Sequence, residues 1–191
     1  MKKYPDMMID TETLALGTNP AILSIGVQAF NRDTGEMGPT FYQEIDFNSA
    51  ARAGEISGSV VAWWVSQGEA AKRLFSQEPA DQQRKLPLAT ALHAMINFFR
   101  ESADVNARVW ANGPAADIVW LESAFVRGCV GLQPPWRYGD VRCVRTALDV
   151  PGFVRPKDAG VKHHALNDAT WQAKAVCAAR KLVLGRNDDE L

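Results

Sequence analysis

The chain has 191 residues, 47% of them hydrophobic, which suffices for one domain with a substantial core. Its 21 basic and 22 acidic residues give a net charge of −1, which excludes the strongly basic surface of a protein that coats nucleic acid. With no apolar run of membrane-spanning length and three widely spaced cysteines, we expect no membrane association, no signal peptide and a cytoplasmic protein with reduced thiols.

The first predicted strand, at 6–12, is apolar until it reaches two carboxylates, Asp10 and Glu12. Residues i and i+2 of a strand face the same side, so these two anions should lie close together. Such a pair requires a proton or a cation, and oxygen ligands alone favour a hard ion such as Mg²⁺ or Mn²⁺. An isolated Asp-x-Glu is more often the polar end of a strand, with Thr11 and Thr13 capping the next segment.

The next predicted elements are two strands and two helices, at 21–30, 40–47, 58–75 and 87–101. The turn at Asn31–Gly35 is a hairpin signal between the two strands. Trp63 and Trp64 are adjacent in the first helix and therefore about 100° apart, so we expect one in the core and one facing a site. An equally good alternative buries both in the core or in an oligomer contact.

A strand at 107–111 and a helix at 115–128 come next, separated by a Gly-Pro turn. Asp117 falls in the first turn of this helix, where the helix dipole alone favours an acid. Asn112, just before the turn, is a candidate to position a phosphate or Asp117, although a role in the turn explains it at least as well.

The chain ends with a short strand or turn near 137–141, a helix at 142–149, a helix at 166–184 and a polar tail at 186–191. If the last long helix begins near Ala165, Asp168 lies in its first turn and His163 in the preceding loop. The aspartate can then bind a metal while the histidine accepts a proton from water. A dipole-stabilised acid and an exposed loop histidine are an equally good explanation. His164 is the poorer base, because it points away if His163 points inward.

Three antiparallel strands followed by alternating helices and strands indicate an α/β protein, with a mixed sheet and helices on its faces. We predict a single domain over residues 1–191, without internal repeats.

The five site residues, in the order Asp10-x-Glu12, Asp117 and His163-x4-Asp168, resemble the DEDDh 3'-5' exonucleases of the ribonuclease H-like superfamily. The resemblance runs from about Met7 to Leu184, and it is strongest to a branch of small prophage and bacterial stand-alone exoribonucleases, often labelled exonuclease VIII-like. It implies a ribonuclease H-like fold with a mainly five-stranded mixed sheet and helices on both faces.

The resemblance also implies a reaction. Two Mg²⁺ ions, for which Mn²⁺ can substitute, would be held by the four carboxylates, Asp10, Glu12, Asp117 and Asp168. His163 would be the general base. The enzyme would cut phosphodiester bonds at the 3' end of a single strand, RNA in preference to DNA, and release 5'-mononucleotides. The alternatives are an oligoribonuclease-like enzyme, a proofreading deoxyribonuclease or a catalytically weak nucleic-acid-binding subunit, and a homodimer is a modest expectation.

Substrate contacts are expected from residues near these motifs. The resemblance places the terminal nucleotide against Thr11, Thr13 and Leu14, while Trp64 is the candidate for base stacking and Asn112 for a phosphate. Four basic residues also lie near the site in sequence order, although each is more often solvated surface charge: Arg142, Arg145, Lys157 and Lys162.

Overall fold

The computed structural model describes residues 2–128, 131–156 and 162–185. Cys129, Lys157 and the predicted tail at 186–191 lie outside the described residues. Within these ranges, no helix combines the length and apolar character needed to cross a membrane.

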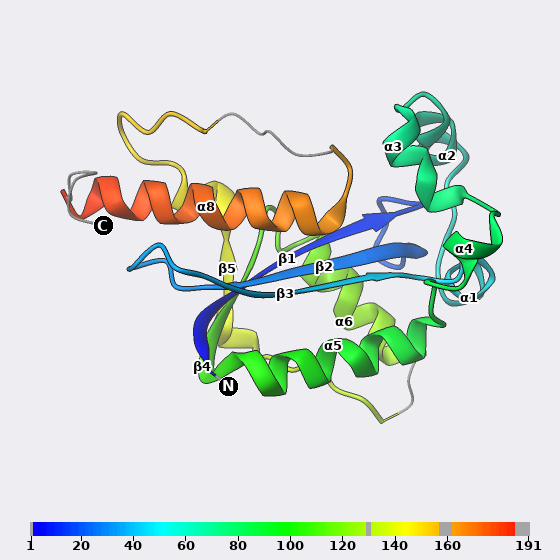
Figure 1. Ribbon diagram of the computed structural model, residues 1–191, viewed down its shortest axis with the longest axis horizontal. Helices are drawn as coiled ribbons and strands as arrows, with labels where there is room; N and C mark the ends of the chain where they lie inside the picture. The colour runs from blue at the N-terminus through cyan, green and yellow to red at the C-terminus, as the bar shows by residue number, and fades with distance from the viewer. Residues whose placement is uncertain (1, 129–130, 157–161, 186–191) are drawn as a thin grey trace.

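The described strands form one mixed sheet in the order β3-β2-β1-β4-β5 (Figure 1). β1 (Tyr4–Thr13) is central and pairs antiparallel with β2 (Ile22–Phe30), which pairs antiparallel with β3 (Met37–Glu44). On its other side β1 runs parallel to β4 (Ala103–Ala111), which runs parallel to β5 (Val141–Cys143). The predicted mixed five-stranded sheet is therefore confirmed.

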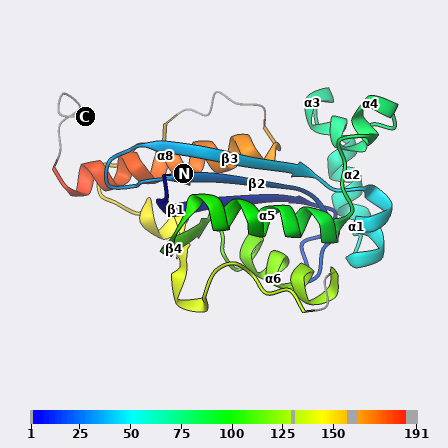
Figure 2. The same cartoon turned by 60° about the horizontal axis from the view of Figure 1, so that its bottom comes forward.

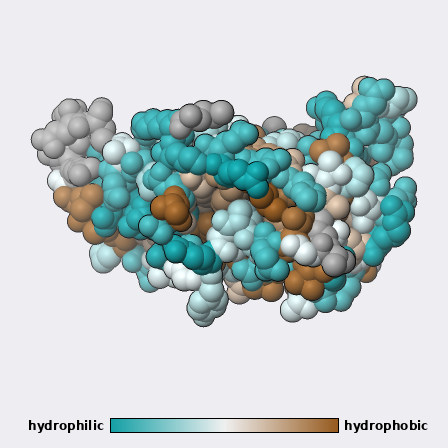
Figure 3. All heavy atoms as spheres, turned by 90° about the horizontal axis from the view of Figure 1, so that it is seen from below, coloured by the Kyte–Doolittle hydropathy of each residue, from teal (hydrophilic) through white to brown (hydrophobic). Residues whose placement is uncertain are grey.

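Long helices cover both faces of this sheet. α8 (Ala165–Val183) lies along one face, while α5 (Leu88–Ser102) and α6 (Asp117–Gly128) lie on the other (Figures 1 and 2). β1 is buried on both sides, since Met7 packs in the core cluster with α5 and α6 and Met8 in the cluster with α8. Because side chains alternate along a strand, the even-numbered residues of β1 face α8. On the outer surface that carries α5 and α6, hydrophobic residues are scattered among hydrophilic ones (Figure 3).

The segment between β3 and α5 differs most from prediction. In place of one helix at 58–75, it contains α2 (Gly58–Val65), α3 (Glu69–Lys72) and a 3₁₀ turn at Arg73–Phe75. Gly68 has extended backbone angles (φ −69°, ψ 162°), which end the helical path before α3 begins. Two further short helices were not predicted, α1 (Phe47–Ala53) and α4 (Pro79–Gln82). This group of helices projects from one end of the sheet (Figure 2).

The remaining predicted elements differ from the observed ones mainly at their ends. β3 begins and ends three residues before the predicted strand. The predicted helix at 142–149 is shortened to α7 (Val144–Ala147), since β5 occupies its first residues, and a 3₁₀ turn at Tyr138–Asp140 precedes β5.

Candidate active site

Three carboxylates from two elements meet at the carboxyl end of β1. Asp10 and Glu12 lie on the α8 side of the strand, and Asp168 lies in the first turn of α8. One oxygen from each carboxylate lies within 4.8 Å of the others, close enough for a single cation to bind all three. A glycine makes this approach possible: Gly26 is opposite Asp10 in β2, and a Cβ there would lie 2.3 Å from the backbone of Ala165.

The fourth predicted carboxylate, Asp117, is held near β1 by two hydrogen bonds from Thr11. Asp117 is the first residue of α6, and its Oδ1 accepts from the backbone N–H (3.1 Å) and the hydroxyl (2.8 Å) of Thr11. Its negative charge raises the pKa of both Asp10 and Glu12, so it shares their electrostatic environment. Asp117 is not in the group of three that converge within 4.8 Å.

Asp6, a fully buried acid of β1, has more hydrogen-bond donors among the described residues than Asp10 or Glu12. Asp6 accepts hydrogen bonds from the Arg108 guanidinium (2.6 and 2.8 Å), the Trp110 indole (2.8 Å) and a backbone N–H (3.1 Å). Asp10 accepts one, from Gln172 Nε2 at 2.8 Å, and no group of the described residues donates to Glu12. Buried charge that is left without donors is costly, and a divalent cation would remove that cost.

The electrostatics of the site result from burial and like charge. Burial, the charge of Asp117 and the charge of Glu12 together hold the pKa of Asp10 well above its ordinary value. Burial and the charges of Asp168 and Asp117 raise the pKa of Glu12 to about 8. Burial raises the pKa of Asp117 to about 6, against the hydrogen bonds from Thr11. Without a cation, the raised pKa values favour the protonated forms of Asp10 and Glu12 near neutral pH, and a cation would allow both to ionise.

His163 lies in the loop before α8, as predicted, but it packs against aromatic rings and is not in the group of converging carboxylates. Its ring contacts Trp63 (4.7 Å between centroids) and Trp64 (6.1 Å). Its backbone φ of 60° is the one positive value found among the described non-glycine residues, a conformation that costs energy and clusters at functional sites. Burial, helped by the charge of Lys162, lowers the pKa of His163, which favours the neutral imidazole.

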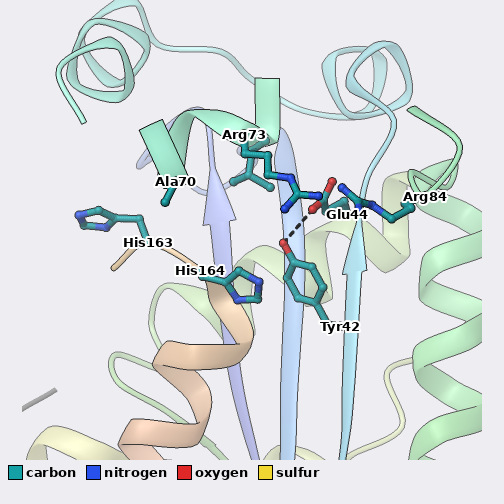
Figure 4. Close-up of a pocket in the computed structure, with 8 residues that line it drawn as sticks. Tyr42, Glu44, Ala70, Arg73, Arg84, His163 and His164 are labelled. Carbon is teal, nitrogen blue, oxygen red and sulfur yellow. Dashed lines mark hydrogen bonds between the residues drawn. The ribbon is translucent and has the colours of Figure 1, made fainter. Parts of the chain in front are cut away.

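His164 has a structural role at the start of α8, and its ring points away from that of His163 (Figure 4). Its Nδ1 accepts from the backbone N–H of Asn167 at 3.4 Å and so caps α8. Its ring stacks on Tyr42, with centroids 4.2 Å apart. These contacts fix the start of α8, and with it the position of Asp168.

A cavity of about 460 Å³ opens beside the carboxylates, between the end of β1, α2 and α6. Thr11 and Thr13, which the resemblance places against the terminal nucleotide, line it together with both tryptophans of α2. Trp64 is 2% exposed, and its indole donates to the carbonyl of Thr13 at 2.9 Å, whereas Trp63 is 43% exposed. Trp63 therefore has the more accessible ring, whereas Trp64, the residue predicted to stack on a base, lines the cavity but is almost fully buried.

Leu14 and Asn112 also differ from the predicted substrate contacts. Leu14 is fully buried in the core, and its backbone pairs with Ala21 and Ser57, so its side chain does not line the cavity. Leu16, which is 75% exposed, lines the cavity instead. Asn112 is absent from the lining; its Oδ1 is buried and has no hydrogen-bond partner among the described residues.

Two of the predicted basic residues act near the site. The charge of Arg145 partly offsets the rise in the pKa of Asp117 that burial causes. The charge of Lys162 helps to lower the pKa of His163. Arg142 instead donates to two backbone carbonyls near β5.

The sequence interpretation missed two site residues, Gln172 and Trp120. Gln172 lies four residues after Asp168 and donates to Asp10, while Trp120 lies three residues after Asp117 and lines the cavity. Spacings of three and four residues place side chains on one face of a helix, so each could have been found from the acid that precedes it.

A family model for the 3'-5' exoribonuclease Rv2179c-like domain matches residues 5–179. A search of curated proteins gave no significant match. Among solved structures, S. pombe Pop2p in its Mg²⁺- and Mn²⁺-bound form is similar, with a TM-score of 0.64 and 12% identity over 97% of this chain and 86% of that one.

Two further solved structures share the fold at 16% identity. A full-length 3'-exonuclease has a TM-score of 0.57 over 96% of this chain and 84% of that one. The nuclease domain of 3'hExo, a DEDDh family member bound to rAMP, has a TM-score of 0.56 over 97% of this chain and 96% of that one. These likenesses show that the chain shares its α/β fold, with a mixed five-stranded sheet and helices on both faces, with these nucleases. Because the family model covers most of its length, the chain belongs to the 3'-5' exoribonuclease Rv2179c-like domain family and is a 3'-5' exonuclease.

Proposed function

We propose that this exonuclease removes nucleotides one at a time from the 3' end of single-stranded RNA, and releases 5'-mononucleotides with the help of two Mg²⁺ ions, for which Mn²⁺ can substitute. The convergence of Asp10, Glu12 and Asp168 within 4.8 Å carries this proposal. The raised pKa values of half-buried Asp10 and buried Glu12 fit a site that needs cations in order to ionise.

The four carboxylates have distinct tasks in this reaction. Asp10, Glu12 and Asp168 would hold one cation, and Asp117, oriented by Thr11, would complete the site for a second. When bound, the cations supply charge neutralisation for the leaving 3'-oxygen and lower the pKa of a water molecule. His163, kept neutral by its lowered pKa, takes the proton from the attacking water.

The cavity of about 460 Å³ that is lined by Trp63, Trp64 and Trp120, called here the tryptophan cavity, would receive the terminal nucleotide. Trp63 offers an exposed ring on which a base of any identity can stack, and the hydroxyls of Thr11 and Thr13 line the same space. The preference for RNA rests on the family description, which names an exoribonuclease, and on the likeness to a nuclease domain that binds rAMP.

The test uses 5'-labelled and 3'-labelled single-stranded RNA and DNA with Mg²⁺, Mn²⁺ or EDTA. We expect a ladder that shortens from the 3' end, faster for RNA, and abolished by EDTA. Asp10→Asn and His163→Ala should each lower the rate by at least about 100-fold, as loss of a metal ligand or a general base does. Asp149→Asn, which changes an exposed acid outside the site, is the control. Equal cleavage in EDTA, or a faster rate on DNA, would contradict the proposal.

A further inference from the structure

A second cavity, of about 400 Å³, lies on the other side of His163. Its polar lining comes from the end of β3, from the segment after α3 and from the loop before α8: Tyr42, Glu44, Arg73, Arg84, His163 and His164 (Figure 4). His163 lines this cavity, and its ring contacts Trp63, which lines the tryptophan cavity. The contact between the rings of His163 and Trp63 therefore lies between the two cavities.

Two arginines give the second cavity unused hydrogen-bond donors. Arg73 and Arg84 each contact the carboxylate of Asp81 through Nη2, and their side chains are 57% and 50% exposed. Their remaining guanidinium N–H groups make no hydrogen bond with the described residues. Planar guanidinium groups bind phosphate oxygens through paired N–H donors, which makes arginine a preferred residue for nucleic-acid backbones.

We propose that this arginine cavity binds the phosphodiester backbone of the nucleotide on the 5' side of the bond that is cut. The inference rests on the proposed function. A strand whose last nucleotide occupies the tryptophan cavity, with its scissile phosphate at the carboxylates, must continue away from that cavity. The arginine cavity adjoins the site across His163 and offers cationic donors to the next phosphate.

An acidic residue, Glu44, also lines the arginine cavity. Its carboxylate is drawn between the side chains of Arg73 and Arg84 in the projection of Figure 4. It accepts a hydrogen bond from the Tyr42 hydroxyl at 3.3 Å. Its charge reduces the attraction of the two arginines for a phosphate. Glutamine at this position keeps an acceptor for Tyr42 and removes the charge, so Glu44→Gln should strengthen binding while loss of the arginines weakens it.

The experiment compares two substrates under steady-state conditions. One is a short oligouridylate, and the other is the p-nitrophenyl ester of uridine 5'-phosphate, which has a leaving group but no nucleotide on the 5' side. For the double variant Arg73→Gln/Arg84→Gln, we expect KM for the oligouridylate to rise about tenfold or more, and its salt dependence to weaken by a slope of about 1. The loss in kcat/KM should be at least about tenfold larger for the oligouridylate than for the ester. Glu44→Gln should lower KM for the oligouridylate about threefold.

Arg100→Gln, an exposed charge on α5, is the matched control, and thermal unfolding checks that each variant is folded. Equal losses on both substrates, an unchanged KM for the oligouridylate, or weaker binding by Glu44→Gln would each overturn the inference. If the wild-type protein hydrolyses neither substrate, the proposed function fails instead, so the two failures are distinguishable.

Discussion

Asp6 and Asp10 lie on the same face of one strand, four residues apart, yet their surroundings differ in kind. Arg108 and Trp110 satisfy Asp6, which makes it a structural acid. Among the described residues, Asp10 accepts a side-chain hydrogen bond from Gln172 alone, and it has like charges beside it. Sequence alone does not separate the two, because each is an aspartate in an apolar strand, and their side-chain partners lie more than 100 residues away in the chain. The strand pattern identified Asp10 only because Glu12 follows two residues later.

Gln172 should orient Asp10 as a metal ligand. The substitution Gln172→Leu roughly keeps the shape of the side chain but removes the group that donates to Asp10. We therefore expect the Mg²⁺ concentration needed for half-maximal activity to rise about 10–100-fold. Titration of activity with Mg²⁺ measures this. Gln133→Leu, an exposed position, is the control. An unchanged Mg²⁺ requirement would show that Asp10 needs no such support.

Substitution of the two adjacent tryptophans of α2 should have different effects: loss of Trp63 should weaken RNA binding, and loss of Trp64 should lower the stability of the fold. Trp63→Ala removes an exposed ring, and since stacking is worth roughly 1–3 kcal/mol per base, KM for RNA should rise about fivefold or more with little change in unfolding. Trp64→Ala removes a buried ring and its hydrogen bond to Thr13, and should cost about 3–5 kcal/mol of stability. Denaturant unfolding and steady-state kinetics on both variants test this. The opposite pattern would show that Trp64 is the stacking residue.

At the level of elements, the site depends on how closely α8 approaches the sheet. Gly26→Ala would place a Cβ 2.3 Å from the backbone carbonyl carbon of Ala165 and from the backbone N of Leu166. The first turn of α8 must then move, taking Asp168 and His163 with it. We expect a loss of about 1–3 kcal/mol in the free energy of unfolding, together with a larger loss of kcat than of substrate affinity.

Gly58→Ala in α2 is the matched control, because nothing lies within 4 Å of the added Cβ. It should stabilise the protein by roughly 0.5–1 kcal/mol and leave kcat unchanged. Full activity in folded Gly26→Ala would show that α8 can shift without disturbing the carboxylates.

Elements with strong periodicity or strong turn signals were predicted well. β1, β2, α5 and α8 agree with the predicted ranges to within two residues. The segment at 58–75 was predicted as one helix, because its apolar residues continue across Gly68, where the backbone is extended. Trp63 and Arg73 lie on opposite sides of this break in the chain. The positions of these proposed substrate-binding residues could therefore not be predicted as well as those of the carboxylates.

For the whole molecule, folding carries an electrostatic cost that depends on pH. The pKa of Glu12 rises from 4.5 to about 8 on folding, so between these values the unfolded chain binds fewer protons than the folded protein. Stability contributed by this group is therefore greatest below pH 4.5 and falls as the pH rises to about 8. Asp117, whose pKa rises from 3.8 to about 6, acts in the same direction over a lower window.

Thermal unfolding should reveal this linkage and the part that cations play in it. In EDTA, we expect Tm to fall between about pH 5 and pH 8, and Glu12→Gln should reduce the fall because the glutamine cannot ionise. With saturating Mn²⁺, which binds the ionised carboxylates, the rise in Tm over the EDTA value should grow across the same interval. Asp149→Asn, which alters an exposed acid, should follow the wild-type curves. A metal-free Tm that rises from pH 5 to pH 8 would mean that Glu12 and its neighbours are ionised in the folded protein without any cation, and that the raised pKa values do not describe this site.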